Sequence, residues 1–121
     1  MLKQLIYNYS SAAATLRGVS STGRGGESAY GIRNVGGSAT LEAENLAALG
    51  KDGSSSNYGL FNYATGDITQ SVLEGATYSV YRGQGNVTVS NSRLVGGPAV
   101  GTVCVLVTRG INISTDGSTC P

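Results

Sequence analysis

The chain has 121 residues, a formal net charge of +1, 12% charged residues and no histidine. The length suffices for one domain with its own core, and the near-neutral charge excludes a basic surface for a phosphate backbone. Without histidine, Ser-His and Cys-His nucleophile systems and histidine metal sites are excluded. We therefore expect no cofactor, no metal and no nucleic acid.

Residues 1–12 are predicted to form a partial first coil, either exposed or covered by a partner. The run Leu5-Ile6-Tyr7-Asn8-Tyr9 resembles Gly-Leu-Phe-Asn-Tyr at residues 59–63, so the sequence starts inside a repeating unit. This opening lacks the apolar core of a signal peptide. No apolar run approaches the roughly 18 residues of a membrane helix, so we expect no membrane insertion.

One phrase recurs along the chain, a tyrosine followed by a small residue and an aliphatic one. It occurs as Tyr-Gly-Ile at 30–32, Tyr-Gly-Leu at 58–60 and Tyr-Ser-Val at 78–80, with a fainter fourth copy at residues 102–105. Because side chains alternate along a strand, the tyrosine and the aliphatic residue are predicted to face the core. The small residue between them is predicted to face outward.

A second phrase lies between these copies. The pairs Leu41 with Leu46, residues 68 with 73, and residues 89 with 94 are each aliphatic and five residues apart, and a glycine follows each pair. A straight strand would turn such residues to opposite faces, so a bend is predicted between them. Residues 41–50 are also strong helix formers, which leaves a short helix as the alternative. Register with the other pairs favours a strand with a bend.

Asn8, Asn34 and Asn62 occupy the same place in three units, each two residues after an Ile or Leu. Stacked asparagines hydrogen-bond from one layer to the next in cross-β assemblies. We therefore expect an asparagine ladder at a turn. The alternative is that asparagine is simply a favourable turn residue.

Units of about 20 to 30 residues cannot bury their own apolar faces, and stacking them creates a continuous core. The sequence therefore predicts an all-β fold, a parallel β-solenoid of four to five coils, with the complete coils over residues 13–103. The predicted core comprises Ile6, Ile32, Leu41, Leu46, Leu60, Ile68, Leu73, Val80, Val89, Leu94, Val103, Val105 and Ile113.

Cys104 and Cys120, the two cysteines, both lie near the C-terminus. A disulfide between them would stabilise the fold by roughly 3 kcal/mol in the chain-entropy model. Two free buried thiols are the alternative. We favour the disulfide, because the last residues otherwise have little to hold them, and it favours an oxidising compartment.

The repeats SNYGLFN and SAYGIRN, with SATLEAENL and GDITQSVLEGATYSVYRGQGNVTVSNSRLVGGP, resemble the right-handed parallel β-helix proteins of pectin-lyase-like architecture. The segment GTVCVLVTRGINISTDGSTCP is similar to the way several such proteins end, which implies a closing segment over residues 104–121. The resemblance implies a right-handed β-helix of a bacterial secreted or surface protein. It does not imply an activity, because this architecture hosts lyases, hydrolases, tail spikes and adhesins.

Complete members of this family have an N-terminal cap, and this chain offers none. An uncapped solenoid end exposes unpaired strand edges and apolar rungs. We therefore expect another protein chain, or a second copy of this one, at the N-terminal end.

Two sets of outward side chains are candidate sites. Glu42 and Glu44 are two residues apart, so a strand places both carboxylates on one outer face, where they suit acid/base chemistry or a cation. The ordinary interpretation is a solvated face. The other set is an aromatic stripe across coils, which suits a protein partner or glycans, and consists of Tyr7, Phe61, Tyr63 and Tyr81.

The function expected is a non-enzymatic structural or adhesive module of an extracellular, cell-surface, fibre or phage-tail-like assembly. The first alternative is a carbohydrate-active enzyme of the pectin-lyase type. The second is a filament subunit that stacks end to end.

Overall fold

The computed structural model describes residues 4–9, 12–110, 112–114 and 120–121. These residues contain strands and no helix, and the strands stack in parallel as a β-solenoid of about four turns. One antiparallel pair occurs among the described strands, at the C-terminal end. The predicted all-β solenoid is confirmed, and residues 41–50 form strands rather than a helix.

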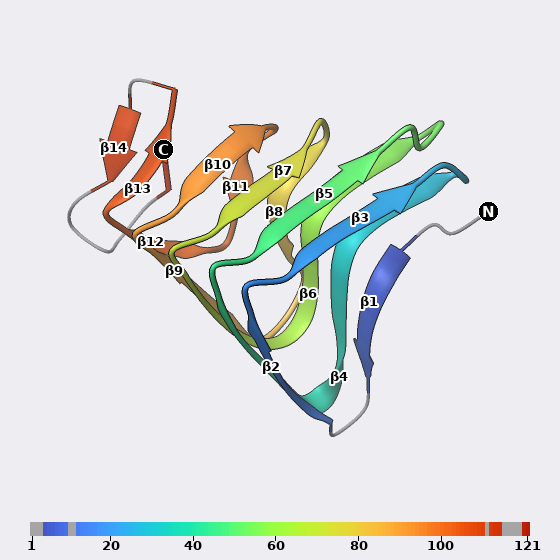
Figure 1. The fold of residues 1–121 in the computed structure, drawn as a ribbon, viewed down its shortest axis with the longest axis horizontal. Helices are drawn as coiled ribbons and strands as arrows, with labels where there is room; N and C mark the ends of the chain where they lie inside the picture. The colour runs from blue at the N-terminus through green and yellow to red at the C-terminus, as the bar shows by residue number, and fades with distance from the viewer. Residues whose placement is uncertain (1–3, 10–11, 111, 115–119) are drawn as a thin grey trace.

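Each turn runs along three walls, which we number in chain order. The first wall contains β1 (Gln4–Tyr9), the beginnings of β4 (Ser28–Glu44) and β6 (Ser56–Thr69), β8 (Tyr78–Arg82) and β11 (Ala99–Val100). The second wall contains β2 (Ala13–Arg17), the ends of β4 and β6, β9 (Asn86–Ser90) and β12 (Val103–Val105). The third wall contains β3 (Ser20–Arg24), β5 (Ala47–Lys51), β7 (Val72–Gly75), β10 (Arg93–Gly96), β13 (Val107–Arg109) and the antiparallel β14 (Asn112–Ser114). Figure 1 shows the coils side by side from the blue N-terminal end to the red C-terminal end.

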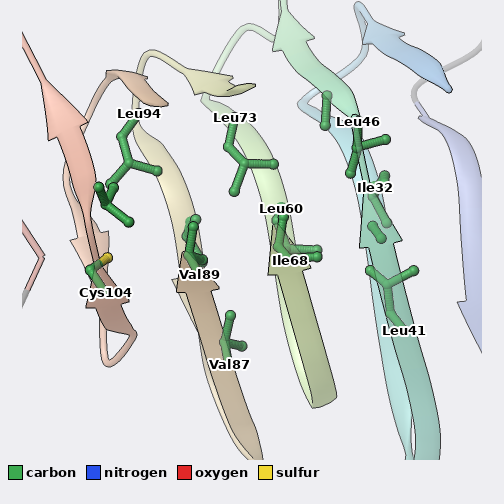
Figure 2. Packing of buried hydrophobic residues seen from close by; sticks show 14 residues of the cluster. Ile32, Leu41, Leu46, Leu60, Ile68, Leu73, Val87, Val89, Leu94 and Cys104 are labelled. Atoms are coloured by element: carbon green, nitrogen blue, oxygen red, sulfur yellow. The ribbon is translucent and has the colours of Figure 1, made fainter. Parts of the chain in front are cut away.

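The core is built from columns of aliphatic residues that stack in register from coil to coil. On the first wall Ile32 pairs with Leu60 and Leu60 with Val80, and all three side chains are fully buried. On the second wall Ile68 pairs with Val89. Figure 2 shows the side chains of Ile32, Leu60, Ile68 and Val89 pointing into the space between the walls. Ile6 continues the first column at the N-terminal end, where it is only partly buried.

Most of the predicted core is confirmed, and its C-terminal members are not. Val103 is 41% exposed and Ile113 is 56% exposed, and Val105 is only partly buried. Cys104 is buried instead, because it pairs with Val89 on the second wall and so turns its neighbours outward. The proposed fourth copy of the tyrosine phrase at residues 102–105 is therefore wrong, since it lies on a different wall from the other copies.

The predicted bend in the second phrase is present, in a different register. Ile68 pairs with Ala43 rather than Leu41, and Leu73 pairs with Ala48 rather than Leu46. Both leucines are nevertheless buried, and Leu41 lies beside Gly66 of the next coil. The sequence alignment that paired Leu41 with Ile68 and Leu46 with Leu73 is therefore displaced by two residues from the observed strand register.

One residue in left-handed conformation marks the corner between the second and third walls in every coil. These left-handed residues are Gly18, Asn45, Gln70, Asn91 and Leu106. In the first four, the backbone N–H donates to a backbone carbonyl oxygen of the next coil. Such a residue turns the chain sharply, so the inward residues on both sides of it point to the core.

The tyrosine phrase is oriented differently from the prediction. Gly59 lies in the interior, where a Cβ atom would lie 2.5 Å from the Ser79 carbonyl oxygen and 2.8 Å from the Glu74 nitrogen. Leu60, the next residue, is also buried, so two consecutive residues face inward. This irregularity turns Tyr58 outward, and the predicted inward tyrosine is wrong.

Candidate functional site

The outer face of the first wall carries a group of aromatic side chains that we call the aromatic patch. The chain has seven tyrosines and one phenylalanine, and all of them belong to it: Tyr7, Tyr9, Tyr30, Tyr58, Phe61, Tyr63, Tyr78 and Tyr81. The buried core cluster contains no aromatic residue among the described residues. The largest apolar side chains are thus concentrated on one outer surface.

Two columns of rings order the patch. Tyr58 stacks on Tyr30 with centroids 5.2 Å apart and planes 7° apart, and on Tyr78 at 5.9 Å and 16°. In the second column Phe61 stacks on Tyr81 at 5.3 Å and 19°. These columns follow the strand register, because Tyr58 pairs with Tyr30 and Tyr78, and Phe61 pairs with Tyr81. The solenoid therefore positions each ring by backbone pairing.

Phe61 is the central ring of the patch. Its centroid lies 5.2 Å from those of Tyr30 and Tyr58 in edge-to-face geometry, and 5.1 Å from the stacked ring of Tyr63. Such contacts contribute about 0.5–1.5 kcal/mol each beyond the area that they bury. The patch is therefore a packed layer whose rings remain partly exposed.

Arg33 lies within the patch, between β1 and β6, in register with Tyr7 and Phe61. Its guanidinium carbon is 5.1 Å from the ring centroids of Tyr7 and Tyr30, and 5.6 Å from that of Phe61. Its Nε atom is buried and has no hydrogen-bond partner among the described residues. The ring faces hold this cation in a fixed place on the surface.

The structure brings the four predicted aromatic residues Tyr7, Phe61, Tyr63 and Tyr81 onto one wall. Sequence reasoning missed Arg33 and the column of Tyr30, Tyr58 and Tyr78. The missed signal was the small residue after each tyrosine: Gly31, Gly59 and Ser79 are all buried, and a Cβ at either glycine would collide with backbone atoms. An inward small residue followed by an inward aliphatic one leaves the tyrosine outside.

The three asparagines form a ladder at the corner between the first and second walls. Asn8 Nδ2 donates to Asn34 Oδ1 at 2.8 Å, and Asn34 Nδ2 donates to Asn62 Oδ1 at 2.8 Å. Asn62 Nδ2 donates to the Ala64 carbonyl oxygen at 2.7 Å. All three side chains are buried, so the ladder satisfies polar groups inside the coil.

Glu42 and Glu44 both lie on the exposed face of β4, as strand alternation predicted, and they have different neighbours. Glu42 lies directly beside Asp67 of the next coil, on the exposed face of the second wall. Glu44 Oε2 lies 4.0 Å from Arg17 Nε, and both side chains are at least half exposed. An exposed ion pair of this kind contributes at most about 1 kcal/mol.

Within the described ranges, no group of three or more His, Cys, Asp or Glu side chains is placed to hold a metal ion. The described part of the chain also has no helix long and apolar enough to cross a membrane.

The C-terminal end is tied by a disulfide between Cys104 and Cys120, whose Cα atoms are 5.0 Å apart. Cys104 is fully buried, and Cys120 packs against the same core cluster. The predicted disulfide is confirmed. Comparison with family models, with curated proteins and with solved structures finds no match to this chain.

Proposed function

We propose that this chain is a non-enzymatic structural module that docks onto another protein through its aromatic patch. The observation that carries the proposal is the placement of all eight aromatic residues on one outer wall. Partly exposed aromatic surface is unfavourable in water and is typical of interaction sites. Tyr, Phe and Arg are the residues enriched at protein interfaces.

A protein partner is favoured over a glycan by the orientation of the rings. Sugars stack on the faces of aromatic rings, and here neighbouring rings cover those faces along both columns. Ring edges and tyrosine hydroxyl groups remain for contact, and these suit the side chains and backbone of a protein. Arg33 adds a partly exposed cation, held against aromatic rings, that a partner carboxylate can reach.

The location proposed is outside the cell, on a cell surface, or on a fibre or phage-tail-like particle. The buried disulfide suits an oxidising compartment. The resemblance to bacterial pectin-lyase-like β-helix proteins supports the same location. In this role the stacked coils act as a stiff support that fixes the spacing of the aromatic side chains.

Photo-crosslinking tests the docking surface. Benzoylphenylalanine replaces Tyr81 on the patch or, as the control, Thr88 on the exposed face of the second wall, and each variant is irradiated in the cells or particles that produce the chain. We expect one discrete protein adduct from Tyr81 and none from Thr88. The adduct should disappear with Arg33→Glu and persist with Arg93→Glu, which changes an exposed arginine on the third wall.

Equal labelling at Tyr81 and Thr88 would contradict the proposal. Binding of the purified chain to a glycan array, lost on Phe61→Ala, would replace the protein partner by a glycan.

Carbohydrate cleavage is the second candidate, and the juxtaposition of Glu42 and Asp67 is the observation that favours it. Two carboxylates on one face are the minimum for general acid/base attack on a glycosidic bond. The test incubates the chain with polygalacturonate and calcium. Product formation that is lost with Glu42→Gln would establish the enzyme, and no product from the unmodified chain would exclude this activity on that substrate.

A further inference from the structure

The asparagine ladder has a direction. Each side-chain amide donates toward the C-terminal coils, from Asn8 to Asn34 and from Asn34 to Asn62, with both N···O distances 2.8 Å. The C-terminal end of the ladder is closed by backbone carbonyl oxygens, those of Ala64 at 2.7 Å and Gln84 at 3.3 Å. At the N-terminal end no described residue donates to Asn8 Oδ1. Among the residues that the structure describes, the ladder therefore ends there in a hydrogen-bond acceptor without a donor.

This acceptor is held in place. Asn8 is only 6% exposed, and its amide donates to Asn34 Oδ1 and to the Thr40 carbonyl oxygen, each at 2.8 Å. Because the amide nitrogen is fixed by these bonds, the side chain cannot flip to present a donor at the open end. A group that binds there has to bring an N–H or O–H.

The strands of the N-terminal coil also have unpaired edges on the side that faces away from the second coil. Among the described strands β1 and β2 pair only with β4, and β3 pairs only with β5, so each presents an unpaired backbone edge. Ile6, Leu16 and Val19 are partly buried, whereas the coil above buries its own members of these columns almost completely. Figure 1 shows β1 and β3 at the free N-terminal end of the stack.

A second copy of this chain does not complement the end. At its C-terminal end Gly101 lies against Arg82, the residue in register with Asn62, and glycine has no side-chain donor. The third wall ends there in β14, which is antiparallel. Two N-terminal ends facing each other would oppose two Asn8 Oδ1 acceptors. Within the described part of the chain, neither head-to-tail nor head-to-head stacking places a side-chain donor in register with Asn8 Oδ1.

We propose that the N-terminal edge binds a parallel β-strand from a further solenoid coil, with the pattern aliphatic-x-Asn. The aliphatic residue covers Ile6, and the asparagine amide donates to Asn8 Oδ1, as Asn8 does to Asn34. Strand addition of this kind takes its affinity from backbone hydrogen bonds and its specificity from alternate side chains. This edge is separate from the protein contact proposed for the aromatic patch, so either can fail without the other.

The probe is a fluorescein-labelled peptide of residues 28–36, SAYGIRNVG, which has this pattern and donates through Asn34 in its native place. Binding to the full chain is followed by anisotropy, and hydrogen exchange locates it. We expect binding that protects the amides of β1, and at least about tenfold weaker binding of the Asn34→Asp peptide, because a carboxylate has no donor. Protection of β11 and β12 instead, or equal affinity of both peptides, would overturn the proposal.

A second experiment joins the peptide covalently to the chain, so that the result does not depend on how tightly the free peptide binds. The same nine-residue segment is joined by a Gly/Ser linker to the N-terminus, with Asn or Asp at the ladder position. The Asn form should unfold at a higher urea concentration than the Asp form. Equal midpoints would show that the edge does not select an amide donor.

Discussion

At the scale of single residues, Asn34 links two neighbouring coils through side-chain hydrogen bonds in the interior. Its amide donates to Asn62 Oδ1 and to the Thr65 carbonyl oxygen, and its own oxygen accepts from Asn8. The side chain is fully buried, so water cannot replace a lost partner. An unsatisfied buried polar group costs about 1–3 kcal/mol.

Replacing Asn34 by alanine should therefore lower the free energy of unfolding by about 2–4 kcal/mol, because it leaves Asn8 and Asn62 each without one partner. Urea unfolding followed by circular dichroism measures the change. Asn86→Ala is the matched control on the exposed face of β9 and should stay within about 0.5 kcal/mol of the unmodified chain. Similar losses from both changes would mean that the ladder does not stabilise the interior.

At the scale of elements, β6 shows how one strand can need glycine in one place and merely tolerate it in another. A Cβ at Gly59 would collide with the backbone of the neighbouring strands, with contacts of 2.5 and 2.8 Å. At Gly66 the nearest atom, Asn62 Oδ1, would be 3.5 Å away, which is ordinary contact. The first glycine lets two walls approach closely, whereas the second has only ordinary contacts with Asn62 and Val87 around it.

Gly59→Ala should destabilise the chain by about 1–3 kcal/mol or more, since backbone atoms cannot move aside as a side chain can. Gly66→Ala, on the same strand, should change the stability by less than about 1 kcal/mol. Thermal unfolding of the two variants in parallel checks the difference. If both lose equal stability, the two walls do not approach each other as closely as described.

The closing segment is a second element whose contribution can be measured. Cys120→Ser removes the bridge to the buried Cys104 and should lower the free energy of unfolding by about 3 kcal/mol in the chain-entropy model. The unmodified chain in reducing buffer should fall to the same value. Unchanged stability in both experiments would show that the C-terminal end is held by packing alone.

At the scale of the whole molecule, the repeat made the fold predictable, because each coil has to match the coil beside it. The Ile32, Leu60 and Val80 column followed from recurrence of the tyrosine phrase. What could not be predicted was local geometry within a unit. An irregularity at Gly59 reversed the face of Tyr58, and Ala43 rather than Leu41 took the place beside Ile68.

The aromatic patch was only half predictable for the same reason. Phe61 and Tyr81 follow inward aliphatic residues, so simple alternation placed them outside. That alternation fails at Tyr30, Tyr58 and Tyr78. The cause is crowding between the residue after the tyrosine and the backbone of a neighbouring wall, as at Gly59, which depends on the three-dimensional packing of the walls. Arg33 joined the patch through strand register, which residue type alone does not reveal.

The most direct test of this account is a set of nuclear Overhauser contacts in solution. The stacked coils predict contacts from the Tyr58 ring to the rings of Tyr30 and Tyr78, and contacts from the Leu60 methyl groups to those of Ile32 and Val80. The two sets should remain separate, because one lies outside the wall and the other inside it. Contacts from the Tyr58 ring to the methyl groups of Ile32 and Val80 would place the tyrosines in the core and contradict the account.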